Sequence, residues 1–244
     1  MPRMTTAVRL VSVLTGFLLT VSRVGATDIP ISIESLATDH YVGVLPTLPT
    51  GTVVFGGVTF DLPSTRPLWT SNGAFSIPPD LIATQTVSAA GVQAVHLLLN
   101  TGNTYASQMS VGQQIGSVIL DFSTGDASVT PLLVGVNIRD AAPGTTAQPV
   151  IGTITDPNVQ QVWSGLNNNG ILEVIDMLTI PVTNSSTLTQ IILDDQSIAL
   201  IGQTNPALSL KGMTITEVPE PEAFWFVLCG LSFVGCLVRS KQCR

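Results

Sequence analysis

Residues 115–134, IGSVILDFSTGDASVTPLLV, decide the fold class of this chain. Val118, Leu120 and Phe122 recur at every second position, which is the period of a β-strand with one buried face. The turn residues STGD at 123–126 then lead into a second β-rich run over 127–134. We therefore predict an antiparallel hairpin here, and with it a β protein.

Similar short, β-branched runs with glycine or asparagine turns fill the chain between residues 27 and 217. Gly56 and Gly57 form a tight hairpin turn between the runs 52–55 and 58–62. Pro131 and Pro181 are expected at sheet edges or strand ends, because proline donates no ladder hydrogen bond. We predict an all-β fold, a two-sheet β-sandwich rather than a barrel. The remaining predicted strands are 92–99, 171–182, 188–193, 198–201 and 207–216, with exposed loops over 145–158 and 166–170.

The composition of this central part restricts the partners it can have. It has 14 acidic residues and only three basic ones, Arg66, Arg139 and Lys211, for a net charge of −11. Nucleic acid is excluded as a partner because binding phosphates needs clustered lysine and arginine. No cysteine lies in residues 27–217, so this domain forms no disulfide and no thiolate metal site.

The first 26 residues predict a signal peptide. Arg3 and Arg9 provide a basic start, an apolar stretch covers 10–21, and the small residues Val24, Gly25 and Ala26 precede a cleavage site. We expect export through the Sec translocon and a mature chain that begins near Thr27.

Residues 218–244, VPEPEAFWFVLCGLSFVGCLVRSKQCR, have three parts. Prolines 219 and 221 keep the Pro219-Glu220-Pro221 box extended. The apolar span 223–238 makes about 24 Å of helix, slightly shorter than a ~30 Å hydrocarbon core, and predicts a single transmembrane helix. The basic residues that follow should stay cytoplasmic, which leaves the domain outside; they are Arg239, Lys241 and Arg244.

This order of box, apolar span and basic tail resembles the PEP-CTERM sorting signal of Gram-negative bacteria. The resemblance implies processing by exosortase, after a stay in the inner membrane, and then release or attachment at the cell surface. A permanent membrane anchor and a buried core helix are the alternatives. The tail cysteines Cys229, Cys236 and Cys243 are either lipidation or interaction sites, or small apolar residues of the helix.

Seven segments of the central domain, 27–217, follow one another in a characteristic order: FGGVTFDLP (55–63), AVHLLLNTGN (94–103), GSVILDFSTGD (116–126), GVNIRD (135–140), LEVIDMLTIPV (172–182), LTQIILDD (188–195) and LKGMTIT (210–216). This order resembles the galactose-binding-like jelly-roll domains of secreted bacterial proteins. The resemblance implies a jelly-roll-like sandwich and a non-catalytic carbohydrate-binding module. Trp69 and Trp163 are the candidates for stacking on a sugar ring, with ordinary core packing as the alternative.

Candidate catalytic and metal-binding residues are few. His40 and His96 are the only histidines, and neither belongs to an HExxH or GxSxG motif. Glu173 and Asp176 are either a glycosidase-type carboxylate pair or a satisfied polar face of one strand. The carboxylates of Asp194 and Asp195 are either calcium ligands or turn caps, and we expect no other cofactor.

These observations favour a non-enzymatic, exported protein of the cell envelope or extracellular matrix. We expect a structural or adhesive role with weak contact to extracellular polysaccharide. A carbohydrate-binding module and a polysaccharide-acting hydrolase remain the alternatives.

Overall fold

The computed structural model describes residues 25–36, 47–63, 69–70, 81–143, 149–196 and 207–218. Among these residues, no helix is both long and apolar enough to cross a membrane. Most of the predicted signal peptide, the predicted strand 198–201 and His40 lie outside the described residues. The predicted sorting tail also lies outside them, including Pro219, Glu220, Pro221, Arg239, Lys241 and Arg244.

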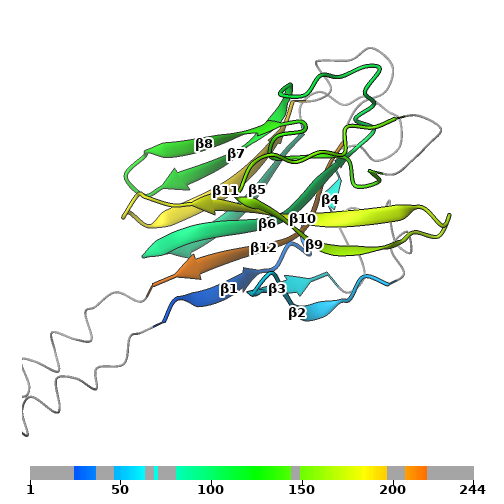
Figure 1. The fold of residues 1–244 in the computed structure, drawn as a ribbon. Helices are drawn as coiled ribbons and strands as arrows, with labels where there is room; N and C mark the ends of the chain where they lie inside the picture. The colour runs from blue at the N-terminus through cyan, green and yellow to red at the C-terminus, as the bar shows by residue number, and fades with distance from the viewer. Residues whose placement is uncertain are drawn as a thin grey trace, which may run out of the picture.

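The described chain is all β, and its sheets are antiparallel (Figure 1). Sheet A has the order β1 (Thr27–Ile31), β12 (Ala207–Glu217), β6 (Val92–Gly102), β10 (Leu172–Pro181) and β9 (Val159–Leu166), and β4 (Trp69–Thr70) also pairs with β12. Sheet C has the order β5 (Leu81–Ala89), β11 (Leu188–Asp195), β7 (Gln114–Phe122) and β8 (Ala127–Leu133). Sheet B is the hairpin of β2 (Gly51–Phe55) and β3 (Val58–Leu62).

The main hydrophobic core lies between sheets A and C. Leu97 and Leu99 of β6 belong to the same buried cluster as Leu120 of β7 and Leu193 of β11. This packing of two antiparallel sheets is sandwich-like and confirms the predicted all-β class.

A second, smaller core covers the other face of sheet A. Phe60 and Leu62 of the sheet B hairpin pack on Leu98, Ile175 and Met177 of sheet A. In Figure 1 this hairpin lies below sheet A, whereas sheet C lies above it. The centre of β6 is therefore buried on both faces, and the hairpin adds a third layer to the expected two sheets.

Both predicted hairpins are present. Phe55 pairs with Val58, and the glycines between them have φ of 58° and 87°, the positive values that a type I′ turn requires. The run 115–134 forms β7 and β8. Pro131 lies on the edge strand β8, and Pro181 ends β10, as the missing amide donor predicts.

Strands β1, β4, β5 and β9 were not among the predicted strands. In β5 the inward positions include Ala83 and Ala89, which give a weak apolar alternation, and β9 has the polar sequence VQQVWSGL. These strands form because neighbouring strands offer them hydrogen bonds and a surface to cover.

Both ends of the described domain meet at one end of sheet A. Thr27 pairs with Glu217, and the register continues to Ile31 opposite Met213. At the other end of β12, Ser209 pairs with Asn100 of β6. The candidate site lies at this second end, away from the termini (Figure 1).

Candidate functional site

At the end of sheet A that is far from the termini, the neighbouring strands β6 and β10 are no longer paired with each other. Strands β6 and β10 pair as far as Leu98 opposite Met177, and the chain segment 139–141 then lies between them. Thr101 N donates to Arg139 O at 3.0 Å, Ala141 N donates to Thr101 O at 2.8 Å, and Val174 N donates to Ala141 O at 2.7 Å. The inserted segment therefore satisfies the separated backbone groups and brings two charged residues, Arg139 and Asp140, into the sheet.

Arg139 binds Asp176 through two hydrogen bonds. Its Nε donates to Oδ2 and its Nη2 donates to Oδ1, each at 2.7 Å. The guanidinium also donates to Gly152 O at 3.1 Å and to Gln161 Oε1 at 2.8 Å. The side chains are only 14% and 3% exposed, so this is a partly buried, bidentate ion pair.

Asn100 contacts the same aspartate from β6. Its Nδ2 donates to Asp176 Oδ2 at 2.8 Å, and its Oδ1 accepts the backbone N–H of Asp176 at 3.1 Å. Asn100 is fully buried. Its side chain replaces the ladder hydrogen bonds that are lost where β6 and β10 separate.

Lys211 lies beside these groups at an irregularity of β12, where the register shifts between Leu210 and Gly212. It is 2% exposed, and its Nζ donates to Ser209 Oγ at 3.0 Å. Burial lowers the pKa of this amine to about 8, while the nearby Glu173 and Asp176 act in the opposite direction.

Glu173 faces Lys211 from β10. Burial raises the pKa of this carboxyl, although a hydrogen bond from Asn167 Nδ2 at 2.6 Å and the charge of Lys211 lower it. We call the following set the polar cluster: Asn100, Arg139, Glu173, Asp176, Ser209 and Lys211.

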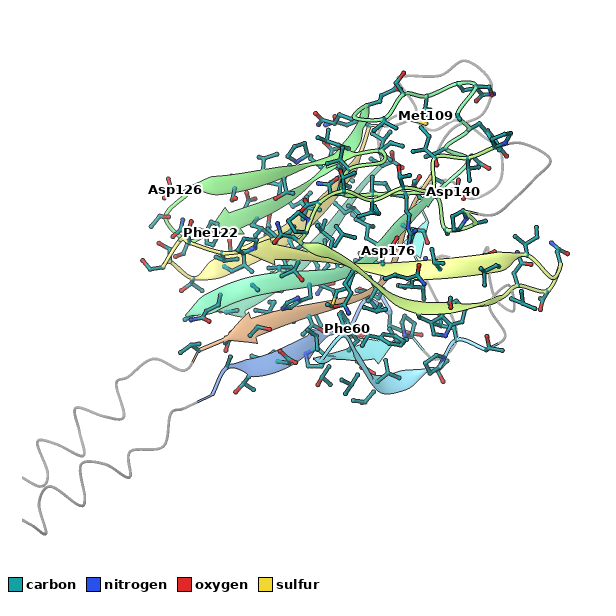
Figure 2. All side chains as sticks on the ribbon, in the orientation of Figure 1. Phe60, Met109, Phe122, Asp126, Asp140 and Asp176 are labelled. Carbon is teal, nitrogen blue, oxygen red and sulfur yellow. The ribbon has the colours of Figure 1, made fainter. Side chains whose placement is uncertain are left out.

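Asp140 fixes the segment that carries Arg139. Its Oδ2 accepts hydrogen bonds from the Thr104 backbone N–H at 3.0 Å and hydroxyl at 3.1 Å, and its Oδ1 accepts from Ala142 N at 2.9 Å. Figure 2 labels Asp140 on the side of the molecule away from the termini and Asp176 nearer to the middle of the domain. The loop is thus tied down on both sides of the ion pair.

The two carboxylates proposed as a glycosidase-type pair both belong to the polar cluster, but they have different partners. Asp176 is held by Arg139 and Asn100, and Glu173 by Asn167. Each of the two carboxylates therefore has its own hydrogen-bond partners.

The two tryptophans lie on opposite flanks of the cluster in the strand order of sheet A. Trp163 on β9 is half-buried and packs against the core beneath the sheet B hairpin. The backbone of Trp69 pairs with Leu210 through β4, and its side chain lies outside the described part of the structure.

Asp194 and Asp195 are adjacent in β11, so their side chains leave opposite faces of the strand. Asp194 Oδ2 accepts from Gln196 Nε2 at 2.6 Å, whereas Asp195 is buried and its Oδ2 accepts from Leu208 N at 3.3 Å. The structure does not bring the two carboxylates together. In the described ranges, no group of three histidine, cysteine, aspartate or glutamate side chains is placed to hold a metal ion.

His96 lies between two threonines of sheet A. Its Nδ1 is 3.0 Å from Thr179 Oγ1 and its Nε2 is 3.0 Å from Thr216 Oγ1. Burial lowers the pKa of this imidazole, and the charge of Asp28 raises it to a smaller extent. Both ring nitrogens therefore lie within hydrogen-bond distance of a threonine hydroxyl of sheet A.

Sequence reasoning missed the roles of Asn100, Arg139 and Lys211. The count of charged residues could have pointed to this cluster, because two of the three basic residues in 27–218 belong to it. A lysine within the apolar run LSLKGMTI is also unusual for a strand that is buried on both faces.

Comparison with known proteins gives no relative: no family model, curated protein or solved structure matches this chain.

Proposed function

We propose that this protein is exported, sorted by exosortase, and acts as a structural or adhesive component of the cell envelope or extracellular matrix. The observation that carries the proposal is the tail 218–244, with its Pro-Glu-Pro box, apolar span and basic end. It follows β12, the strand that pairs with β1 at the start of the mature domain. Signal peptide and sorting tail would then leave the domain from the same end.

This arrangement supports display of the end of sheet A opposite the termini away from the membrane. From Glu217 to Ser209 strand β12 spans eight residues, which is about 26 Å at the rise of a β-strand. A tail held in the membrane would place the cluster and Trp163 at the outward end. Contact with extracellular polysaccharide is the role we infer for that end.

The strand order supports a jelly-roll body. Sheet A contains the order β12-β6-β10 and sheet C the order β5-β11-β7-β8. The chain crosses between the sheets from β5 to β6, from β6 to β7, from β10 to β11 and from β11 to β12. Alternation of the chain between the four-stranded run β1-β12-β6-β10 of sheet A and the four strands of sheet C is the pattern of a jelly roll.

A carbohydrate-binding module is the second candidate, and Trp163 is the observation that favours it. Trp163 is half-buried and lies two residues along β9 from Gly165, which pairs with Glu173, so its indole offers a stacking surface close to hydrogen-bonding groups in the register of the sheet. Asn167 and Glu173 would supply those hydrogen bonds.

Binding to matrix polysaccharide and to a glycan array tests this role on residues 27–218. We expect weak binding that falls about tenfold in Trp163→Ala, which corresponds to roughly 1.4 kcal/mol. The matched control is Leu166→Ala on the same strand, because Leu166 is already exposed and should not matter. Circular dichroism of each variant checks that the fold is retained.

Absence of binding by the parent domain to any polysaccharide would remove both the module and the glycan contact. A purely structural role would then remain as the proposal, and only the sorting of the protein would bear on it. Equal loss in Trp163→Ala and Leu166→Ala would place the contact elsewhere on the domain.

A further inference from the structure

We propose that Lys211 and Asn100 react with each other to form an amide cross-link between β12 and β6, with Asp176 carrying the proton. The polar cluster would thus be an autocatalytic modification site. This cross-link would depend on the contacts inside the cluster and not on where the protein is sorted.

The strand register brings the amine and the carboxamide to the same place. Asn100 lies directly opposite Ser209, and such pairs have Cβ atoms about 5 Å apart. Lys211 Nζ is 3.0 Å from Ser209 Oγ, so the amine lies beside the residue that pairs with Asn100. For the reaction, rotation about the lysine side chain must carry Nζ from Ser209 Oγ to Asn100 Cγ.

The carboxamide is held by groups that an acyl transfer needs. The backbone N–H of Asp176 donates to Asn100 Oδ1 at 3.1 Å, where negative charge would develop during attack. The carboxylate of Asp176 accepts from Asn100 Nδ2 at 2.8 Å, which is the nitrogen that must leave. Arg139 holds this carboxylate in place through its two hydrogen bonds.

The reaction balances without any other reactant. The lone pair of the neutral amine attacks Asn100 Cγ, and the carbonyl electrons move to Oδ1 beside the Asp176 N–H. Nζ then gives one proton to the Asp176 carboxylate, which passes it to Nδ2. The Cγ–Nδ2 bond breaks, ammonia leaves with that electron pair, and the Nζ–Cγ amide remains.

The surroundings favour this reaction. Burial lowers the pKa of Lys211 to about 8. The neutral amine is then on the order of one tenth of the population at pH 7. Asn100 and Lys211 are both buried, so water does not compete with the amine.

The amide product would also remove the energetic cost of a buried ammonium whose hydrogen bonds are incompletely satisfied. Among the described residues, the ammonium of Lys211 donates one hydrogen bond, to Ser209, although it carries three N–H groups. An amide has no charge and needs only one donor and one acceptor satisfied. The cross-link would join the last strand before the tail to the central strand of sheet A.

Peptide mapping of the full-length protein tests the proposal. After tryptic digestion, we expect one cross-linked species that contains Asn100 and Lys211 and is lighter than its two parts by one ammonia. Trypsin should not cleave after Lys211, because the acylated side chain no longer carries a positive charge. As a second measurement, an amine-reactive reagent applied to the denatured protein should leave Lys211 unlabelled.

Three variants sharpen the test. Lys211→Arg keeps the charge but should give no cross-linked peptide, and Ser209→Ala on the same strand should still form one. Asp176→Asn should lower the cross-linked fraction at least tenfold while circular dichroism remains of the β type. Parent protein with free, labelled Lys211 and no cross-linked peptide would overturn the proposal, whatever the variants do.

Discussion

Arg139 and Asp176 form a two-point ion pair inside sheet A, with both N–O distances at 2.7 Å. The arginine comes from a loop and the aspartate from β10, so the pair holds the loop segment in place where β6 and β10 separate. Removal of one partner from such a pair leaves an uncompensated buried charge.

We expect Arg139→Met to lower the free energy of unfolding by about 3–5 kcal/mol, because Asp176 keeps its charge without its main partner. Urea titration followed by circular dichroism measures this. The double variant Arg139→Met with Asp176→Leu should recover much of the loss, since no buried charge remains. A loss below about 1 kcal/mol in the single variant would mean that solvent screens the pair as on a surface.

The two faces of β7 should differ in their sensitivity to truncation. Leu120 is 1% exposed in the core between sheets A and C, so Leu120→Ala should cost about 2–5 kcal/mol. Its neighbour Ile119 is half-buried on the outer face of sheet C, and Ile119→Ala should cost less. Equal losses measured by thermal or urea unfolding would require a partner that covers the outer face.

The glycines of the sheet B turn should tolerate a side chain unequally. Both have positive φ, so alanine strains the backbone at either position, by roughly 1 kcal/mol. A Cβ on Gly56 would also lie 2.8 Å from Met177 Cε, whereas a Cβ on Gly57 would meet no atom within 4 Å. Gly56→Ala should therefore destabilise more than Gly57→Ala, and equal melting temperatures would contradict this packing.

Stability should decline in mildly acidic solution through His96. Burial lowers its pKa in the folded state below the ordinary value of 6.5, so the unfolded chain binds more protons once the pH drops below that value. The contribution of His96 is present above pH 6.5 and is lost as the pH falls through the folded-state pKa. Glu173, whose pKa is raised, acts with the opposite sign, so total stability alone is not diagnostic.

The diagnostic quantity is the difference in unfolding free energy between the parent and His96→Gln, measured by urea titration from pH 7.5 to pH 5. As the pH drops, the unfolding free energy of the parent should decrease relative to that of His96→Gln. A difference that stays constant across this range would show that the imidazole does not titrate differently on unfolding.

Sorting should depend on the Pro-Glu-Pro box. Replacement of Pro219, Glu220 and Pro221 by alanine should leave export intact but block release, because alanine lets the helix extend back through the extended box. Full-length protein with an intact tail should accumulate in the inner-membrane fraction, as judged by mass spectrometry. Surface or medium levels equal to those of the parent would mean that the tail is an ordinary anchor or is cleaved by something else.

Local pattern was enough to determine much of the fold. The alternation of Val118, Leu120 and Phe122 around a polar turn specified the β7–β8 hairpin, and Gly56-Gly57 specified the β2–β3 turn. Pro131 and Pro181 were correctly assigned to a sheet edge and a strand end for the same reason, since these properties belong to the residues themselves. The sequence also yielded the charge balance and the sorting hypothesis, which depend on composition and order alone.

Tertiary structure alone decided the third layer and the polar cluster. Nothing local in the sequence indicates that the β2–β3 hairpin covers Leu98 and Met177, because that contact joins residues far apart in the chain. Asn100, Arg139 and Asp176 meet only because β6 and β10 separate and a loop enters between them. Local propensity and pattern specify strands and turns, whereas long-range packing decides which buried polar groups become partners.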